Sequence, residues 1–174
     1  SAKAVLTQDI TVNTGVLDGD GKLTSNPSSF TGWTPIGNYI NKITYTGTFD
    51  GKGHTISGLY YAGSTFRLGF FDYVGSGGSV SNVGIVDSYF SGGINAGGVC
   101  GVNYGSVTNC YHTGAVSGSN TGGVCGGNDS PGNITNCYYE TMDGIAGGIK
   151  GSDVTGKAEG KATKEFSDGV VAYL

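Results

Sequence analysis

Aromatic side chains recur at spacings that suit the binding of a ligand. The chain of 174 residues holds eleven tyrosines, and Tyr111 and Tyr138 each follow a copy of the same Thr-Asn-Cys segment. Tyrosine combines a flat apolar ring with a polar hydroxyl group, so it can contact a sugar ring and still face water. Four tyrosines are therefore candidate ligand-binding residues: Tyr104, Tyr111, Tyr138 and Tyr139. In the alternative interpretation, these rings only cover the edge of a core.

A short acidic segment resembles the start of a calcium-binding loop. Asp18 and Asp20 stand at the first and third positions of Asp-Gly-Asp-Gly-Lys. Loops of this type also need an oxygen ligand at the fifth position and a Glu at the twelfth. Lys22 occupies the fifth position, and the twelfth holds no Glu. Calcium at Asp18 and Asp20 is one interpretation, a polar turn is the other, and no other cofactor is indicated.

Residues suited to catalysis are present, but no motif brings them together. The best candidates are Asp50, Asp72, Asp87, Lys52 and Arg67. General acid–base chemistry on polysaccharides needs two carboxyl groups at a set separation. These residues fall at different positions of the repeat described below, so we expect no catalysis.

The two histidines also lack the partners that catalysis needs. His54 lies in a glycine-flanked segment close to Asp50, and no recognised motif places a Ser or Cys nucleophile beside it. We expect His54 to bond to the backbone at a turn. We expect His112, which follows Cys110 and Tyr111, to lie on a loop.

The four cysteines form two repeated pairs. Cys100 is equivalent to Cys125, and Cys110 is equivalent to Cys137. Buried thiols pack as small hydrophobic groups, but equivalent residues on adjacent strands also lie within reach of a disulfide bond. Both interpretations stay open. The sequence holds no Cys-x-x-Cys pair, which is the usual start of a structural zinc site.

These recurrences belong to a repeat of about 25 residues. Residues 97–121 align with residues 122–146, with two residues inserted before the second strand-like segment. A degenerate copy begins near residue 68, and weaker copies lie at 53–59 and 8–13. Periods of this length mark solenoids, propellers or arrays. Short apolar–polar alternation between Gly and Asn residues is typical of strands joined by turns.

The repeat predicts an all-β fold, a right-handed parallel β-helix or solenoid with coils of about 25 residues. A single coil cannot bury its inward residues, whereas a stack forms a continuous core. Stacking would align equivalent side chains as an apolar ladder and an amide ladder: Val80–Val107–Ile134 and Asn82–Asn109–Asn136.

The repeat also suggests how the chain is divided. Residues 1–146 are expected to form the solenoid, with N-terminal coils or a cap at 33–60 and regular repeats at 68–146. Residues 147–174 lose the repeat, so we expect a C-terminal cap or a linker to a next module there. A short helix is expected at 162–166, with Thr163 as its N-cap.

The composition excludes two classes of partner. The net charge is -4 with no basic stripe, so nucleic acid is not expected as a partner. No apolar run approaches the ~20 residues that a membrane-spanning helix needs, so no membrane insertion is expected. Gly contributes 35 residues, but a hydrophobic content of 37% is enough for a core and argues against a flexible linker.

The repeat resembles the GLUG-motif domain of bacterial surface proteins. The resemblance rests on GGVCGVNYGSVTNCYHTGAVSG at 97–118 and GGVCGGNDSPGNITNCYY at 122–139, where Cys100 and Cys125 take an apolar position of the motif. Two upstream segments, Trp33–Gly37 and Gly47–Leu59, also resemble the part that precedes the repeats in such proteins. The family includes adhesins and the N-terminal regions of IgA1-specific metallopeptidases, whose zinc motif does not occur in this chain.

The resemblance implies a non-catalytic extracellular module of a larger bacterial cell-surface protein, secreted or anchored at the cell surface. Such a module would act as an adhesin stalk or as a ligand-binding surface. Its partners would be a host or polysaccharide surface ligand and the flanking domains of the same polypeptide. The alternatives are a carbohydrate-binding module and a polysaccharide-degrading β-helix enzyme.

Overall fold

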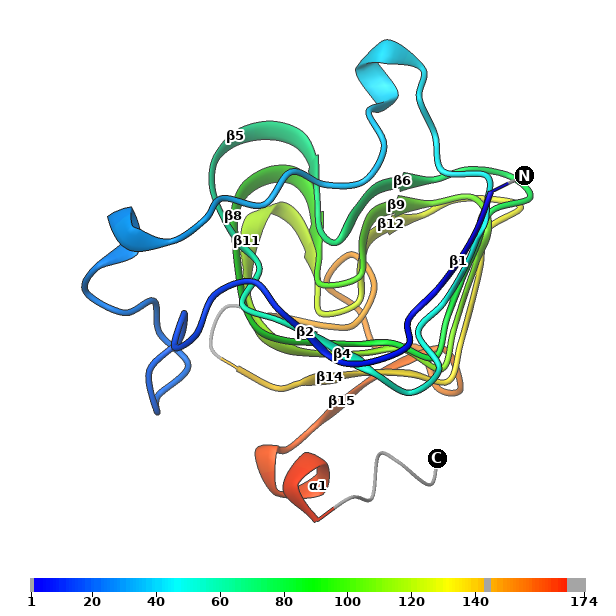
Figure 1. Cartoon of the computed structure of the whole chain (residues 1–174). Coiled ribbons are helices and arrows are strands. Elements are labelled where there is room, and N and C mark those ends of the chain that lie inside the picture. The colour runs from blue at the N-terminus through cyan, green and yellow to red at the C-terminus, as the bar shows by residue number, and fades with distance from the viewer. Residues whose placement is uncertain (1, 143–144, 169–174) are drawn as a thin grey trace.

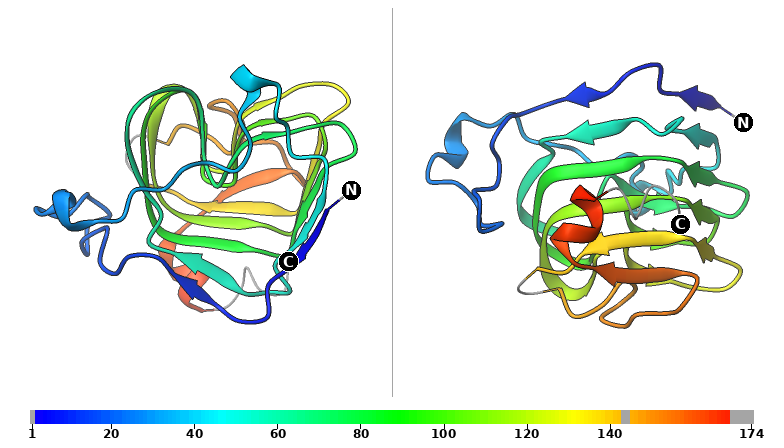
Figure 2. Two further views of the ribbon diagram at one scale, coloured as in Figure 1. Left: turned by 45° about the horizontal axis from the view of Figure 1, so that its top comes forward. Right: turned by 90° about the horizontal axis from the view of Figure 1, so that it is seen from below.

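The computed structural model describes residues 2–142 and 145–168, and these wind into a β-solenoid of about 3 turns. Strands make up 52% of the chain and helices 7%, which confirms the predicted all-β class and the solenoid. Figure 1 looks along the stack, so that successive coils overlap as nested outlines. Figure 2 shows the strands of successive coils lying side by side.

Three parallel sheets form the faces of the solenoid. The first runs in the order β1 (Lys3–Val5), β3 (Thr48–Asp50), β7 (Ser79–Ser81), β10 (Ser106–Thr108) and β13 (Asn133–Thr135). The second runs in the order β15 (Ala158–Lys161), β14 (Cys137–Glu140), β11 (Tyr111–Gly122), β8 (Gly84–Gly97), β4 (Thr55–Ser57) and β2 (Ile10–Thr11), and β5 (Tyr60–Leu68) also pairs with β8. The third runs in the order β12 (Cys125–Asn128), β9 (Cys100–Asn103) and β6 (Phe71–Val74).

Alternating side chains explain why these short segments form strands. In β7 and β10 a buried Val lies between two half-buried polar residues, and β13 buries Ile134 in the same way. Val80, Val107 and Ile134 are register partners, so the predicted apolar ladder is confirmed. Phe49 of β3 extends it by one coil. The inward side chains of one coil are buried fully only when the next coil stacks on them, so stacking stabilises every coil.

The coils are longer than the sequence alignment predicted. Gly97 pairs with Gly122, which keeps the predicted spacing on one face. The coils as a whole measure about 27 residues, because Val107 pairs with Ile134 on another face. The two inserted residues lie in the turn between β12 and β13. Coil length therefore varies at the turns, while the strands stay in register.

Asparagines at one corner adopt left-handed backbone and connect the coils. Asn82, Asn109 and Asn136 have φ of 55°, 53° and 49°. The Asn109 amide donates to Asn82 Oδ1 at 3.1 Å, and the Asn82 amide donates to Asp50 Oδ1 at 2.9 Å. The predicted amide ladder thus forms between Asn82 and Asn109 and continues to Asp50, but among the described residues no side-chain hydrogen bond joins Asn109 to Asn136. The hydrogen bond from Asn82, followed by those from Lys52, lowers the pKa of Asp50 to about 2.

The paired glycines of the repeat make room for rings. A side chain at Gly98 would overlap the ring of His112, and one at Gly123 would overlap the ring of Tyr139. His112 and Tyr139 are register partners in adjacent coils. The second Gly of each Gly-Gly-Val-Cys segment therefore faces a ring of the third strand after it, β11 for Gly98 and β14 for Gly123.

Outside the strands, the chain is less regular. Two 3₁₀ helices, η1 (Pro27–Ser29) and η2 (Tyr39–Asn41), lie on a long excursion between β2 and β3. The end of the stack is formed by β15, which pairs with β14, and by Ile149, which bridges to Cys125. After β15 comes α1 (Thr163–Ser167), as predicted, but Ala162 is its N-cap and Thr163 its first helical residue. The predicted role of Thr163 is therefore wrong by one position.

Candidate functional site

Tyr111 and Tyr138 lie side by side, as the repeat predicted. They are register partners on β11 and β14. Phe166 of α1 lies 5.8 Å from the Tyr111 ring, and the other neighbour of Tyr111 is Gly84. Desolvation by these neighbours raises the pKa of Tyr111. Lys161 Nζ lies 5.6 Å from the centre of the Tyr138 ring. This pair is thus partly covered by the C-terminal segment.

Tyr139 does not fit a surface role. Its side chain is 3% exposed and belongs to the hydrophobic core. Burial, with a smaller contribution from Asp153, raises its pKa to about 12. The prediction that Tyr139 contacts a ligand is therefore corrected, because alternation along β14 turns Tyr139 inward and leaves Tyr138 outside.

Tyr104 belongs to a different aromatic cluster. Its ring stacks on that of Tyr73 at 5.2 Å and 20°, and Tyr73 stacks on Tyr39 at 4.9 Å and 25°. We call Tyr39, Tyr73 and Tyr104 the tyrosine row. Burial raises the pKa of Tyr73 to about 12, while Asp129 beside the hydroxyl raises that of Tyr104. The structure thus separates the four predicted tyrosines into two outer clusters and one core residue.

Arg67 of β5 lies against the tyrosine row. Its guanidinium carbon is 3.9 Å from the centre of the Tyr39 ring and 5.5 Å from that of Tyr73. Cation–π contacts of this kind hold a guanidinium flat against a ring. Close packing fixes the base of the side chain, because a Cβ at Gly101 would lie 2.7 Å from Arg67 Cβ.

Asp72 of β6 anchors the segment that carries Tyr39. Its Oδ2 accepts a hydrogen bond from the Tyr39 backbone N–H at 3.2 Å. Burial raises the pKa of Asp72, and this exceeds the opposing effects of that hydrogen bond and of the charge of Arg67. Asp72 is thus a positioning residue for the tyrosine row.

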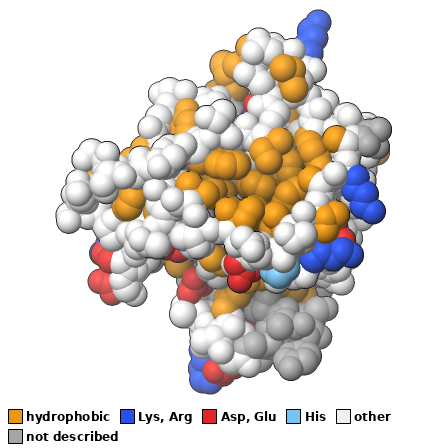
Figure 3. All heavy atoms as spheres, in the orientation of Figure 1, with side chains coloured by type: hydrophobic (Ala, Val, Ile, Leu, Met, Phe, Trp, Pro, Cys, Tyr) orange, Lys and Arg blue, Asp and Glu red, His pale blue; other side chains and the backbone are white. Residues whose placement is uncertain are grey.

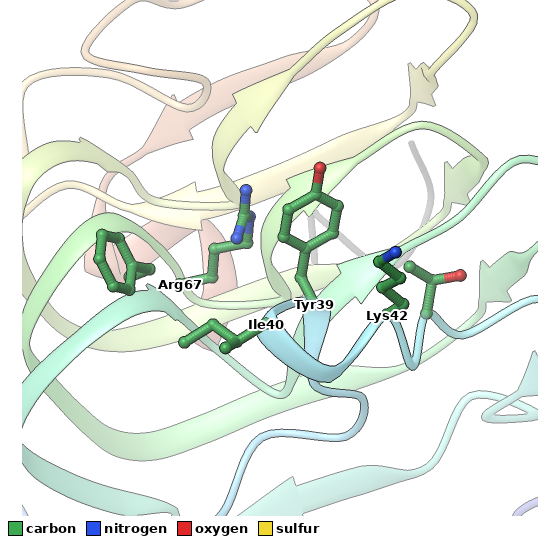
Figure 4. A pocket seen from close by; sticks show the side chains of 6 residues that line it. Tyr39, Ile40, Lys42 and Arg67 are labelled. Atoms are coloured by element: carbon green, nitrogen blue, oxygen red, sulfur yellow. The ribbon is translucent and has the colours of Figure 1, made fainter.

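A hollow opens beside Arg67 and Tyr39. Its volume is about 540 Å³. Figure 4 shows Tyr39, Ile40 and Lys42 reaching it from η2 and the residues that follow, with Arg67 beside them. Thr44 and Phe66 complete the lining. The hollow joins two positive charges, two aromatic rings and the hydroxyl groups of Tyr39 and Thr44, a combination suited to a ligand with both apolar and negatively charged parts.

The Asp18–Asp20 segment forms a closed turn. Asp18 Oδ1 accepts hydrogen bonds from the backbone N–H groups of Asp20 and Lys22 at 3.0 and 2.9 Å. Leu17 and Leu23 bridge the two sides of the loop. Within residues 2–142 and 145–168, no group of three or more His, Cys, Asp or Glu is arranged to hold a metal ion. Calcium binding by Asp18 and Asp20 stays a prediction.

The other charged candidates lie at separate places. Lys52 Nζ pairs with Asp50 at 3.0 Å. Asp87 accepts from the backbone N–H groups of Val16 and Leu17. His54 Nδ1 lies 3.3 Å from Asp9 Oδ1, so its neighbour is this side chain and not the backbone group expected.

His112 is not on a loop but inside β11, fully buried. Among the described residues, neither ring nitrogen has a hydrogen-bond partner. Desolvation lowers the pKa of His112 to about 3, and the Gly123 backbone opposes this shift only in part. The expected loop is therefore wrong, because alternation along β11 turns position 112 inward.

The cysteines are free thiols, all four buried. The sulfurs of Cys100 and Cys125 lie 3.3 Å apart in the core. The neighbouring Cys125 thiol, together with burial, raises the pKa of Cys100, and burial raises that of Cys110. The sequence left core thiols and disulfide bonds open, and the structure contains core thiols.

Sequence reasoning found Tyr104 and Arg67 but missed Tyr39, Tyr73 and Lys42. Tyr39 and Lys42 lie on the excursion between β2 and β3, where no repeat indicates which coil they meet. Tyr73 pairs with Val102, so alignment of the coils would not have matched it to Tyr104. The three tyrosines of the row are not register partners of one another, so only the three-dimensional arrangement shows that their rings stack.

Comparison with known proteins gives one partial similarity. The chain is 32% identical over 108 residues to halomucin of Haloquadratum walsbyi (strain DSM 16790 / HBSQ001). The matched part is 61% of this chain and spans 1% of the length of halomucin. No family model matches the chain, so the GLUG resemblance stays a prediction. No solved structure matches it either. In the part of the chain that the structure describes, no helix has the length and apolar character to cross a membrane.

Proposed function

We propose that this chain is a non-catalytic β-solenoid module of a larger secreted or cell-surface protein, in which it serves as a stalk and as a ligand-binding surface. The solenoid fold fits this role, because stacked coils form a rigid body with long regular faces. The similarity to a small part of a much longer protein also supports it.

The apolar end of the stack is the observation that carries the proposal. Figures 1 and 3 view the molecule from the same side, onto the end of the stack where β1 and β2 lie. Figure 3 shows hydrophobic side chains gathered in the middle of this end. Leu6, Val12, Trp33 and Ile36 are only partly buried against the core there. Large apolar patches on a protein surface mark interaction sites. A neighbouring part of the same polypeptide would cover this end.

Immunoblotting tests the proposal on the natural protein. An antibody raised against this chain should detect a polypeptide far larger than 174 residues, and it should label intact source cells or their culture medium. A natural product of about the size of this chain, or labelling that requires permeabilised cells, would overturn the proposal.

Carbohydrate binding is a second candidate, supported by the tyrosine row and its hollow. The outer rings of the row, Tyr39 and Tyr104, can present apolar faces to sugar rings, and Arg67 is a donor for their oxygen atoms. Binding to a glycan array should be weakened by Tyr39→Ala and Tyr104→Ala and retained in Tyr111→Ala and Tyr138→Ala. The reverse pattern would move the site to the tyrosines of β11 and β14.

The enzyme alternative has the weaker support. Asp50 and Asp87 are engaged in structural contacts at separate places, and Asp72 holds the backbone of Tyr39. Incubation with a panel of polysaccharides should release no new chain ends. Turnover that is lost in a variant of one of these carboxylates would contradict the non-catalytic proposal.

A further inference from the structure

Arg67 forms no close ion pair with a described residue, although the charge of Asp72 is near enough to interact with it. Within the described residues, no carboxylate oxygen lies within 4.0 Å of its guanidinium nitrogens, and its buried Nε has no hydrogen-bond partner. The rings of Tyr39 and Tyr73 cover one side of the group. Because Nε itself is buried, a ligand in the hollow would contact the guanidinium through its other two nitrogens.

Lys42 adds a second cation to the same hollow. It ends η2 in a left-handed conformation with φ of 60° and is held by a hydrogen bond from its N–H to the Tyr39 carbonyl. Both positive side chains line the hollow, as Figure 4 shows. The chain as a whole carries a net charge of -4, so this local positive character is not a general property of the surface.

The remaining lining is apolar or neutral. Tyr39 is 44% exposed, Ile40 66% and Phe66 56%, and Thr44 adds a hydroxyl group. Exposed aromatic faces beside a guanidinium group suit a sugar ring that carries a negative charge. Arginine matches a carboxylate especially well, because its planar group can form two parallel hydrogen bonds with the two oxygens.

We propose that the hollow between Arg67, Lys42 and Tyr39 binds the carboxylate-bearing sugar of an acidic polysaccharide. The sugar carboxylate contacts the guanidinium of Arg67, and Lys42 on the other side of Tyr39 adds a second attraction. A sugar ring lies against Tyr39, and the row continues toward Tyr73 and Tyr104. This inference rests on the carbohydrate-binding candidate above and specifies its ligand. It does not depend on the module being a stalk.

Calorimetric titration with defined oligosaccharides tests the inference. The probes are an oligogalacturonate, a neutral gluco-oligosaccharide of the same length and a sulfated oligosaccharide of similar charge. The oligogalacturonate should bind most tightly, and added salt should weaken its binding. Arg67→Gln should reduce its affinity by roughly tenfold or more, in line with the loss of a charged hydrogen-bonded contact. Arg67→Lys should restore part of it.

Exposed residues provide variants that do not disturb the fold. Lys42→Gln removes a charge and Tyr39→Ala removes a ring, and each should weaken binding several-fold. Lys3→Ala is the matched control, because Lys3 is an exposed lysine of β1, away from the hollow. If Arg67→Gln changes the thermal unfolding curve, these two variants decide the result without it.

The outcomes separate this inference from the candidate function beneath it. Equal binding of neutral and acidic oligosaccharides would overturn the inference and leave carbohydrate binding in place. Tighter binding of the sulfated probe would overturn the assignment to a carboxylate. Binding of none of the three probes would overturn the inference, whereas a separate glycan-array signal at the tyrosine row would still support the candidate function.

Discussion

Single residues in the core of this solenoid combine burial with polarity. His112 is fully buried, its nitrogens lack partners among the described residues, and its ring lies 6.2 Å from that of Phe90. The next coil places the ring of Tyr139 at the equivalent position. A histidine in such a place must stay neutral, because the apolar surroundings penalise its charged form. His112 therefore links the stability of the solenoid to pH.

Replacing His112 with Phe should remove an acid sensitivity. The folded-state pKa of His112 is lowered to about 3 from an ordinary value of 6.5. The unfolded chain binds a proton below pH 6.5, while the folded chain does not until about pH 3, so stability falls as the pH falls through this window. The loss in the native sequence should be roughly 2 kcal/mol between pH 6.5 and 5.

Urea unfolding at several pH values measures this effect. His112→Phe should fit, because Tyr139 already places a six-membered ring over the equivalent glycine, and its stability should change less over the same range. Parallel pH profiles for the two proteins would show that His112 does not carry the effect.

The cysteines should be unreactive until the solenoid opens. All four are buried free thiols, so a reagent cannot reach them in the folded protein. The raised pKa values of Cys100 and Cys110 also keep these two in the unreactive protonated form. A thiol reagent such as a maleimide should label the folded protein slowly, at least tenfold more slowly than a model thiol. In denaturant without a reductant it should label four sites. Fewer than four would reveal a disulfide bond in the protein as isolated.

At the level of elements, the paired glycines explain how large rings enter a narrow coil. A Cβ at Gly98 or Gly123 would overlap the ring of His112 or Tyr139. In each repeat, a glycine without a side chain thus lies opposite a large ring in the interior of the coil. Glycine is abundant in this chain partly because neighbouring backbone and rings approach these positions closely.

Gly98→Ala should destabilise the solenoid by about 2 kcal/mol, the typical cost of overfilling a core. The added methyl group would have to displace the His112 ring. Removing that ring in the double variant Gly98→Ala/His112→Ala should recover part of this loss of stability. The changes in the free energy of unfolding should then be non-additive in a double-mutant cycle. Gly19→Ala is the control, because nothing lies within 4 Å of a Cβ there. Strict additivity would contradict the proposed contact.

The strands could be predicted because their information is local and repeated. Apolar residues at every second position and asparagines at fixed corners identified β7, β10 and β13 and aligned them correctly. The excursion that carries η2 could not be placed, because it has no equivalent in the neighbouring coils. The tyrosine row depends on where that excursion folds back, so Arg67 and Tyr104 were recognised as candidates but not as neighbours.

On the scale of the whole molecule, the two ends of the stack differ. β15, Ile149 and α1 follow the last coils at one end. At the other, β1 and β2 are the last strands of their sheets among the described residues, and the core below them is only partly covered. Unpaired strand edges beside apolar side chains favour association with another chain. The isolated module should therefore associate through this end.

Ile10 allows this association to be tested. It pairs with the buried Ile56 and so points toward the core, yet it is 40% exposed, because no coil lies above it in the described structure. Sedimentation velocity should show oligomers of the isolated chain as its concentration rises, and Ile10→Lys should weaken their formation by at least severalfold, since burying an unpaired ammonium group is costly.

Ile94→Lys is the matched control, because Ile94 is 44% exposed on β8 in the middle of the stack. Equal effects of the two substitutions would indicate general stickiness of exposed isoleucines. A reduction confined to Ile10→Lys would identify this end of the stack as the surface through which the isolated chain associates.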